Sequence, residues 1–324
     1  MPAISVIIPF YNSSEYIRHT LNSVLSQTLS DIEIICVDDG STDRSAEIIL
    51  GLRAEDNRIV YIKQENAGAG IARNNGIRHA RGKYLAFMDS DDEYPSVDAL
   101  EKLYLKAEEN DVSICGGAMW EPEGSISSRQ YREVGLLDFR FNQCIFWFSR
   151  FIYSRALLIE NNCFFPPYRV FEDPIFLLKA LDKAKAFYVI PESVYKINKR
   201  HTSAGVFSTQ QLKDYLCALL DIMSISIRNN YKDVFQTCLF EIQGRFYTES
   251  INCLREKRAD EDFVEMLFAI NSYFGTIEKL YLDNELSFYI NKNYFLYRMG
   301  QIRIIIYRIA LKIFVKVPKK YFKP

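Results

Sequence analysis

The first 120 residues alternate short apolar runs with amphipathic stretches. Each run is apolar at nearly every position, which is typical of strands covered on both faces of a parallel sheet. The predicted strands are residues 4–9, 32–38, 59–63, 84–89 and 112–116, and the predicted helices are 15–27, 42–54, 70–80 and 98–110. Strands and helices that alternate at this spacing form βαβ units. The pattern therefore predicts an open α/β sheet with flanking helices.

The pattern changes beyond residue 120. An aromatic stretch at 143–161 predicts a helix, and so does the stretch at 172–184. Pro191 separates two short predicted strands, 186–189 and 193–197. Four helical patterns follow, at 210–228, 231–256, 260–273 and 278–290. We therefore predict an α/β domain over residues 1–207 and a helical domain over 208–293.

The composition is that of a folded protein. The chain has 324 residues, of which 48% are hydrophobic, and this length is sufficient to bury a large core. Its seven cysteines form no CxxC or Cys/His cluster, which argues against a zinc site or a disulfide framework. The start, MPAISVIIPF, lacks the features of a secretion signal, and no run of about 18 apolar residues occurs. We expect a cytoplasmic catalytic part.

The charge is unevenly distributed. Residues 294–324 carry eight Lys or Arg and no acid, so the remaining 32 basic residues face 41 acidic ones, a net charge of −9. Such an acidic body argues against a nucleic-acid partner. In a helical register one stripe of the tail is basic: Arg298, Arg308, Lys312, Lys316, Lys319 and Lys323. Apolar residues fill the opposite face, which suits an interfacial helix on an anionic membrane. Packing of this face onto the protein body is the alternative.

Polar residues follow three of the predicted strands. The sequence PFYN ends the first, DDGSTD the second and DSDD the fourth. Ligands of open α/β sheets bind where strands end, and clustered carboxylates repel one another unless cations or hydrogen-bond donors compensate. Thr42 and Asp43 have an alternative role as caps of the next helix. Asp89 and Asp91, spaced two apart after an apolar strand, provide hard oxygen ligands for Mg²⁺ or Mn²⁺.

Four segments together resemble the family-2 glycosyltransferases of the GT-A fold: SVIIPFYN, EIICVDDGSTD, NAGAGIARNNGIRHARGKYLAFMDSDD and FEDPIFLLKAL. The resemblance covers residues 3–205. It implies a Rossmann-like, mostly parallel sheet and a site for a nucleotide-sugar donor. The QxxRW signature of processive polysaccharide synthases is missing, so we expect a non-processive enzyme.

The resemblance also implies roles for individual residues. Asp39 corresponds to the nucleobase contact, in a pocket shaped by Pro9, Tyr11 and Asn12. Asp89 corresponds to the ribose contact and Asp91 to the direct metal ligand. Arg73 and Asn74 fall in the segment that resembles the donor-contacting helix. For Arg73, a solvated helix position is the alternative.

Two further residues have roles implied by the resemblance. Asp173 matches the catalytic base that takes the proton of the acceptor hydroxyl. Pro174 also fits the first position of a helix, and a helix start leaves the carboxylate able to face the acceptor. His201 corresponds to a position that can contact the metal or the pyrophosphate, with a solvent-facing loop residue as the alternative.

Together these features predict an inverting, metal-dependent glycosyltransferase. UDP is the favoured donor nucleotide, and hexosyl or N-acetylhexosaminyl transfer to a glycan or lipid-linked glycan is expected, in surface polysaccharide assembly. The basic tail over 294–324 suggests peripheral contact with the inner face of the cytoplasmic membrane. A sugar nucleotidyltransferase is a second interpretation, although PFYN stands where its glycine-rich loop belongs. A catalytically inactive binding module is a third.

Overall fold

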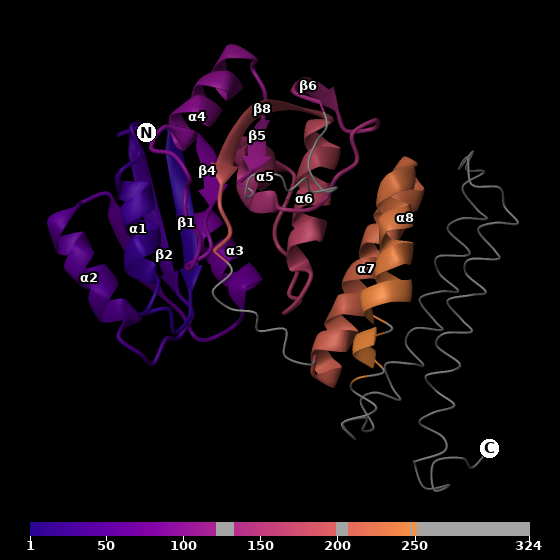
Figure 1. The fold of residues 1–324 in the computed structure, drawn as a ribbon, viewed down its shortest axis with the longest axis horizontal. Helices are drawn as coiled ribbons and strands as arrows, with labels where there is room; N and C mark the ends of the chain where they lie inside the picture. Colours follow the sequence, from indigo (N-terminus) through magenta and orange to yellow (C-terminus); the bar gives the residue numbers. More distant parts are fainter. Residues whose placement is uncertain (121–132, 199–206, 247, 251, 253–324) are drawn as a thin grey trace, which may run out of the picture. The chain divides into compact units, whose positions relative to one another are not determined.

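The computed structural model describes residues 1–120, 133–198, 207–246, 248–250 and 252 (Figure 1). The chain divides into two compact units, residues 1–201 and 202–324. The first unit contains the α/β sheet, and the second is helical where it is described. The predicted division at residues 207 and 293 stays a prediction.

The first unit is built on one mixed sheet of eight strands in the order β3-β2-β1-β4-β7-β5-β8-β6. Four of its strands come from the N-terminal βαβ units: β1 (Ile4–Phe10), β2 (Ile32–Asp38), β3 (Ile59–Lys63) and β4 (Tyr84–Phe87). They pair in parallel, with Ile7 opposite Ile35 on one side and Phe87 on the other. All residues of β1 and β2 are buried, as the apolar runs predicted.

The other half of the sheet contains the antiparallel pairs. β5 (Ile114–Met119) is parallel to β8 (Ala186–Tyr195), while β7 (Phe151–Ser154) runs antiparallel to both β4 and β5. β6 (Gly135–Asp138) forms the edge, antiparallel to β8. Because β7 reverses direction between β4 and β5, the strands β1, β2, β4, β5 and β8 all end at the same sheet edge.

Helices cover both faces of the sheet. α1 (Ile17–Leu25), α2 (Ser45–Glu55) and α4 (Ala99–Glu109) contribute Leu21, Ile49 and Leu100 to one core, which contains Val6 and Ile34 of the sheet. α3 (Ala69–His79) packs against β1 and β2. A cluster of aromatic rings fills the space between Phe87 of β4 and α6 (Glu172–Ala184).

Three predicted elements were wrong in detail. The helix predicted over 143–161 is a 3-10 turn (Phe148–Arg150), then β7, then a short helix α5 (Arg155–Glu160). A strand buried on both faces is apolar at every position, so periodicity cannot distinguish it from a buried helix. The two strands predicted around Pro191 form one continuous β8, with Pro191 exposed.

The second unit begins with two helices, α7 (Thr209–Asn229) and α8 (Lys232–Glu241), which pack together and continue into a π-helical turn (Ile242–Phe246). Ser208 caps α7 in a capping box with Gln211. The helical C-terminal region is thus confirmed as far as it is described. The helices predicted at 260–273 and 278–290, the basic tail and His201 lie outside the described residues. Within the described part, no helix has the length and apolar character needed to cross a membrane.

Candidate active site

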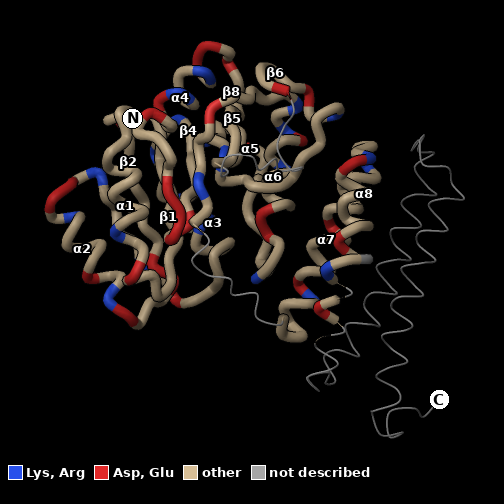
Figure 2. The backbone as a smooth tube through the Cα atoms, viewed as in Figure 1, with Lys and Arg blue, Asp and Glu red and all other residues tan. Residues whose placement is uncertain are grey.

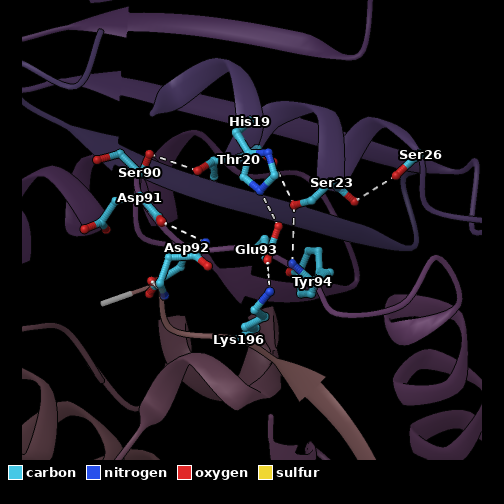
Figure 3. Close-up of polar contacts among 11 residues, drawn as sticks. His19, Thr20, Ser23, Ser26, Ser90, Asp91, Asp92, Glu93, Tyr94 and Lys196 are labelled. Carbon is cyan, nitrogen blue, oxygen red and sulfur yellow. Dashed lines mark hydrogen bonds and ion pairs between the residues drawn. The ribbon is translucent and has the colours of Figure 1, made fainter. Parts of the chain in front are cut away.

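The acidic loop, which we define as Asp89–Asp92, follows β4 at the shared sheet edge (Figure 3). Asp89, Ser90 and Asp91 are partly exposed, whereas Asp92 is 5% exposed. In Figure 3 the Asp91 carboxylate extends to the side away from Glu93 and Tyr94. The loop therefore presents carboxylate oxygen atoms at the edge where ligands of α/β sheets bind.

A second group of predicted residues follows β1 and β2. Tyr11 is 51% exposed, as expected of a ring available for stacking on a ligand. Asn12 has a positive φ of 49°, and its Oδ1 accepts a hydrogen bond from the Thr42 N–H at 2.8 Å. Pro9 is buried within β1, beyond the last residue that pairs with β4, so its missing N–H leaves no gap in that pairing. Asn12 thus joins the ends of two adjacent strands.

Asp39 is buried and strongly hydrogen-bonded. Its Oδ1 accepts from the Ala67 N–H and from Gln64 Nε2, both at 2.8 Å, and its Oδ2 accepts from the Gly68 N–H at 2.9 Å. A carboxylate can accept about four hydrogen bonds, so three leave room for one more. Gly68 has a φ of +93°, which glycine adopts without strain. Asp39 therefore fixes the entry into α3 and keeps capacity for one ligand hydrogen bond.

Arg73 of α3 joins the acidic loop to α6. Its NH2 donates to Asp89 Oδ1 at 2.7 Å and its NH1 to Glu172 Oε1 at 2.8 Å. The guanidinium carbon lies 4.8 Å from the centre of the Phe148 ring and 5.2 Å from that of Phe165. Burial lowers the pKa of Arg73, but the carboxylates of Asp89 and Glu172 outweigh burial and raise it. The solvated position considered for Arg73 is wrong, because its side chain is only 6% exposed.

Asp173 lies beside this ion pair, in the first turn of α6. Burial raises the pKa of its carboxyl to about 7, the Glu172 carboxylate adds to this, and Arg73 opposes it. A carboxylate with a pKa near neutrality is a stronger proton acceptor than an ordinary aspartate. A hydrogen bond from its own backbone N–H, in the first turn of α6, also lowers this pKa in part. The arrangement can therefore support general-base chemistry.

Asn74 is turned towards the protein interior. Its Nδ2 donates to the Phe165 carbonyl at 2.8 Å, and its Oδ1 accepts from the Phe165 N–H at 2.9 Å. The side chain thereby holds the segment that leads into α6. A Cβ atom on Gly70 would lie 3.1 Å from Glu172 Cγ and 3.3 Å from Phe165 Cβ, which is a close approach for side-chain atoms. Gly70 therefore allows Glu172 to lie close to α3, and donor contact by Asn74 stays a prediction.

The carboxylates fit a hard cation that completes its coordination with substrate. Asp89 is 37% exposed and uses only Oδ1 for Arg73, and Asp91 lies two residues further along the loop. Within the described residues no group of three or more His, Cys, Asp or Glu side chains is placed to hold a metal ion alone. Mg²⁺ is usually bound through one or two carboxylates plus substrate phosphates, so the donor set suits this mode. Asp91 as the direct ligand stays a prediction.

Sequence reasoning did not identify two residues, at and just beyond the end of β8, that contact the acidic loop. The Tyr195 hydroxyl donates to Asp92 Oδ2 at 2.8 Å, and Asn198 donates through its side chain to the Asp91 carbonyl at 3.1 Å. Burial, and next the nearby Asp89, raise the pKa of Asp92 to about 7. Nothing in the local pattern marks either residue, because their partners lie about one hundred positions earlier in the chain.

Charges of both signs are interspersed over the described residues (Figure 2).

Comparison with known proteins identifies the class. Residues 5–176 match the family described as "Glycosyl transferase family 2". The glycosyltransferase GlyG of Streptococcus pneumoniae is 31% identical over 270 residues, which are 72% of this chain and 88% of GlyG. The chain therefore belongs to glycosyl transferase family 2, and the resemblance seen in its motifs is confirmed.

Other relatives match over a smaller part of their length. The "Uncharacterized glycosyltransferase EpsJ" of Bacillus subtilis is 34% identical over 209 residues, which are 60% of each protein. The match to the GlyA glycosyltransferase of S. pneumoniae spans only 16% of that protein, at 46% identity. A Campylobacter jejuni protein named "GalNAc(5)-diNAcBac-PP-undecaprenol beta-1,3-glucosyltransferase" is 30% identical, over 74% of this chain and 80% of its own.

Solved structures share the fold. S. aureus TarS 1–349, determined with UDP-GlcNAc, superimposes with a TM-score of 0.69 at 24% identity, covering 86% of this chain and 83% of TarS. The mannosyltransferase PcManGT of Pyrobaculum calidifontis, determined with GDP-Man and Mn²⁺, gives a TM-score of 0.58 at 16% identity, covering 98% and 88%. At such identities the likeness shows the fold alone. The predicted fold class is confirmed.

Proposed function

We propose that this protein transfers a sugar from a nucleotide diphosphate donor to an acceptor hydroxyl, with inversion at the anomeric carbon. The observation that carries the proposal is the bridge through Arg73. One terminal nitrogen of the guanidinium binds Asp89, on the donor side. The other binds Glu172, which directly precedes Asp173. A single-displacement reaction requires the leaving diphosphate and the base that activates the acceptor to be held in one fixed arrangement.

On the donor side, Tyr11, Asn12 and Asp39 form the proposed nucleoside pocket, with Pro9 beneath it. Exposure of the Tyr11 ring and the spare accepting capacity of Asp39 support this assignment. Asp39 would accept from a ring N–H of the base. Uracil offers such a donor, and TarS, which has the same fold, was determined with a UDP-sugar. We therefore favour UDP-hexose or UDP-N-acetylhexosamine as the donor.

A divalent cation, Mn²⁺ or Mg²⁺, would be held by Asp91, with Asp89 close to it and oriented towards the ribose. When bound, such an ion neutralises the charge that develops on the diphosphate. PcManGT, which has the same fold, was determined with Mn²⁺. His201 as a further contact to the metal or the pyrophosphate rests on the sequence motif.

Asp173 is the proposed base. Its pKa of about 7 allows it to be ionised at neutral pH and still to bind the acceptor proton. Glu172 is held by Arg73 and orients the acceptor side. Inversion follows from direct attack on the face opposite the leaving group, since the proposal involves no covalent intermediate.

For the acceptor, we propose a glycan or lipid-linked glycan of surface polysaccharide assembly. One relative is named for transfer onto an undecaprenol-linked acceptor, and another is named "Poly(ribitol-phosphate) beta-glucosyltransferase". The basic, amphipathic tail would hold the enzyme at the inner face of the cytoplasmic membrane, next to such acceptors. Addition of one sugar for each binding event follows from the missing processive signature.

Screening nucleotide sugars for release of UDP or GDP, with and without Mn²⁺, tests the proposal and distinguishes an enzyme from an inactive binding module. Asp173→Asn should lower turnover on the order of 10²- to 10⁴-fold and leave donor affinity nearly unchanged. Asp31→Asn is a matched control, because Asp31 is exposed and lies at the opposite end of β2. Loss of donor binding in Asp173→Asn, or full turnover, would refute the role of Asp173. If no nucleotide sugar released UDP or GDP, the proposal that this protein is an active glycosyltransferase would be refuted.

A further inference from the structure

The acidic loop is fixed by hydrogen bonds from several elements (Figure 3). Thr20 of α1 donates its Oγ1–H to the Ser90 carbonyl at 2.9 Å, and Ser13 and Ser90 share a hydroxyl hydrogen bond of 2.8 Å. Arg73 holds the Asp89 side chain from α3. These contacts act on the first half of the loop.

The end of β8 holds the loop from the other side. The Tyr195 hydroxyl, which is fully buried, accepts from the Asp89 N–H at 3.1 Å and donates to Asp92 Oδ2 at 2.8 Å. The Asn198 N–H donates to Asp92 Oδ1 at 3.0 Å, and its Nδ2 donates to the Asp91 carbonyl at 3.1 Å. Four hydrogen bonds therefore connect two residues near the end of β8 to three of the four loop residues.

One hydroxyl spans the whole loop. Because Tyr195 contacts the backbone of the first loop residue and the side chain of the last, it fixes the distance between the two ends of the loop. The partly exposed Asp91 lies between these two points. Lys196 contributes a neighbouring ion pair with Glu93 at 2.6 Å, and His19 contacts the same carboxylate. Glu93 thus anchors the segment just beyond the loop.

Asp92 is not itself available to a ligand, since its two oxygens accept hydrogen bonds from Tyr195 and Asn198 and it is 5% exposed. A buried carboxylate is costly unless hydrogen-bonded, and an apolar residue in its place would pack at lower cost. The carboxylate at position 92 is therefore better explained by its role in fixing the loop conformation than by a contribution to stability. Binding groups must be held to within about 0.5 Å to act together on a ligand.

We propose that Tyr195, supported by Asn198, is a positioning residue that presets the acidic loop for binding a divalent cation together with the donor diphosphate. This inference rests on the proposed function, because it assumes that Asp91 binds the cation. Loss of the Tyr195 hydroxyl would leave the Asp89 N–H and Asp92 Oδ2 without these partners. The loop would then relax, although every proposed ligand would still be present.

Mn²⁺ binding in the presence of saturating UDP tests the proposal without depending on turnover. The signal of free Mn²⁺ in electron paramagnetic resonance falls as the ion binds. In Tyr195→Phe the Kd for Mn²⁺ should rise about 10- to 100-fold, the usual effect of losing a group that orients a metal ligand. UDP affinity without metal, measured by calorimetry, should fall less than Mn²⁺ affinity, because Tyr11, Asn12 and Asp39 are untouched and Arg73 still holds the Asp89 side chain. Tyr188→Phe is the control, since it removes a hydroxyl from the same strand at the other end.

A second variant covers the case in which Tyr195→Phe fails to fold. Asn198→Ala changes a partly exposed residue and removes only the hydrogen bond to the Asp91 carbonyl, so it should fold and raise the Kd for Mn²⁺ severalfold. An unchanged Kd in a folded Tyr195→Phe protein would overturn the inference. If Tyr195→Phe does not fold, an unchanged Kd in Asn198→Ala would overturn it. If the wild-type protein bound neither Mn²⁺ nor UDP, the proposed function would fail instead.

Discussion

The bridge through Arg73 makes a quantitative prediction about stability. In Arg73→Met the apolar stem remains beside Phe148 and Phe165, while the charge that serves Asp89 and Glu172 is lost. Both Trp residues, Trp120 and Trp147, belong to the first unit, so tryptophan fluorescence reports its unfolding specifically.

The expected loss of unfolding free energy depends on how well water can solvate the two carboxylates once the Arg73 charge is removed. Asp89 is 37% exposed and is largely screened, whereas Glu172 is only 12% exposed. Removing one partner of a buried ion pair costs about 3–5 kcal/mol. Because only one of the two carboxylates is well buried, we expect a loss at the lower end, about 3 kcal/mol. Arg78→Met on the same helix is the control, since Arg78 is exposed and such changes cost about 0.5 kcal/mol or less.

The loss should also depend on pH. Arg73 opposes the rise in the pKa of Asp173, so its removal should raise that pKa above about 7. A carboxyl with a raised native pKa binds more protons in the native than in the unfolded state, so its ionisation destabilises the fold as the pH rises. At pH 6 Asp173 is mostly protonated in both proteins and contributes little to the difference. The deficit of Arg73→Met should therefore be smaller at pH 6 than at pH 8.5.

Urea-induced unfolding at both pH values measures the deficit. The reasoning would be refuted by a deficit below about 1 kcal/mol at pH 8.5, because that would mean the buried ion pair is effectively solvated. It would equally be refuted by a deficit that grows towards acid pH. Comparable losses in Arg78→Met would show that the effect belongs to helix α3 in general.

Three further predictions concern activity and location. If Asp173 is the base, kcat/KM should rise about tenfold per pH unit below pH 7 and then level off; a flat profile would contradict the assignment. EDTA should abolish transfer, Mn²⁺ or Mg²⁺ should restore it, and Asp91→Asn should lose most activity with an unchanged circular dichroism spectrum; full activity of this variant in chelator would argue against a metal. Deleting residues 295–324 should abolish salt-sensitive binding to anionic vesicles and preserve transfer to a soluble acceptor, since each basic residue near such a surface contributes about 1 kcal/mol. Aggregation of the truncated protein would indicate that the apolar face belongs to the core.

Much of the fold of the N-terminal half was predictable, because short stretches of sequence are enough to define its strands and helices. Strands apolar on both faces, separated by helices, predict a parallel sheet, and parallel strands present their carboxyl ends at one edge. The grouping of Tyr11, Asp39 and Asp89 at that edge follows from this rule alone. The start of α6 at Glu172 was also predicted, although Pro174 is the third residue of the helix and not its first.

The sequence by itself determined the order of the βαβ units, because local periodicity specifies them. The resemblance of its motifs to a known family supplied the family and the candidates for the donor pocket, the metal ligand and the base. The tertiary structure alone decided that β7 inserts antiparallel between β4 and β5, and that Arg73 bridges Asp89 and Glu172. It also decided that Tyr195 spans the acidic loop. These pairings join residues up to 106 positions apart, and a buried polar side chain reveals its partner only when the fold brings the two together.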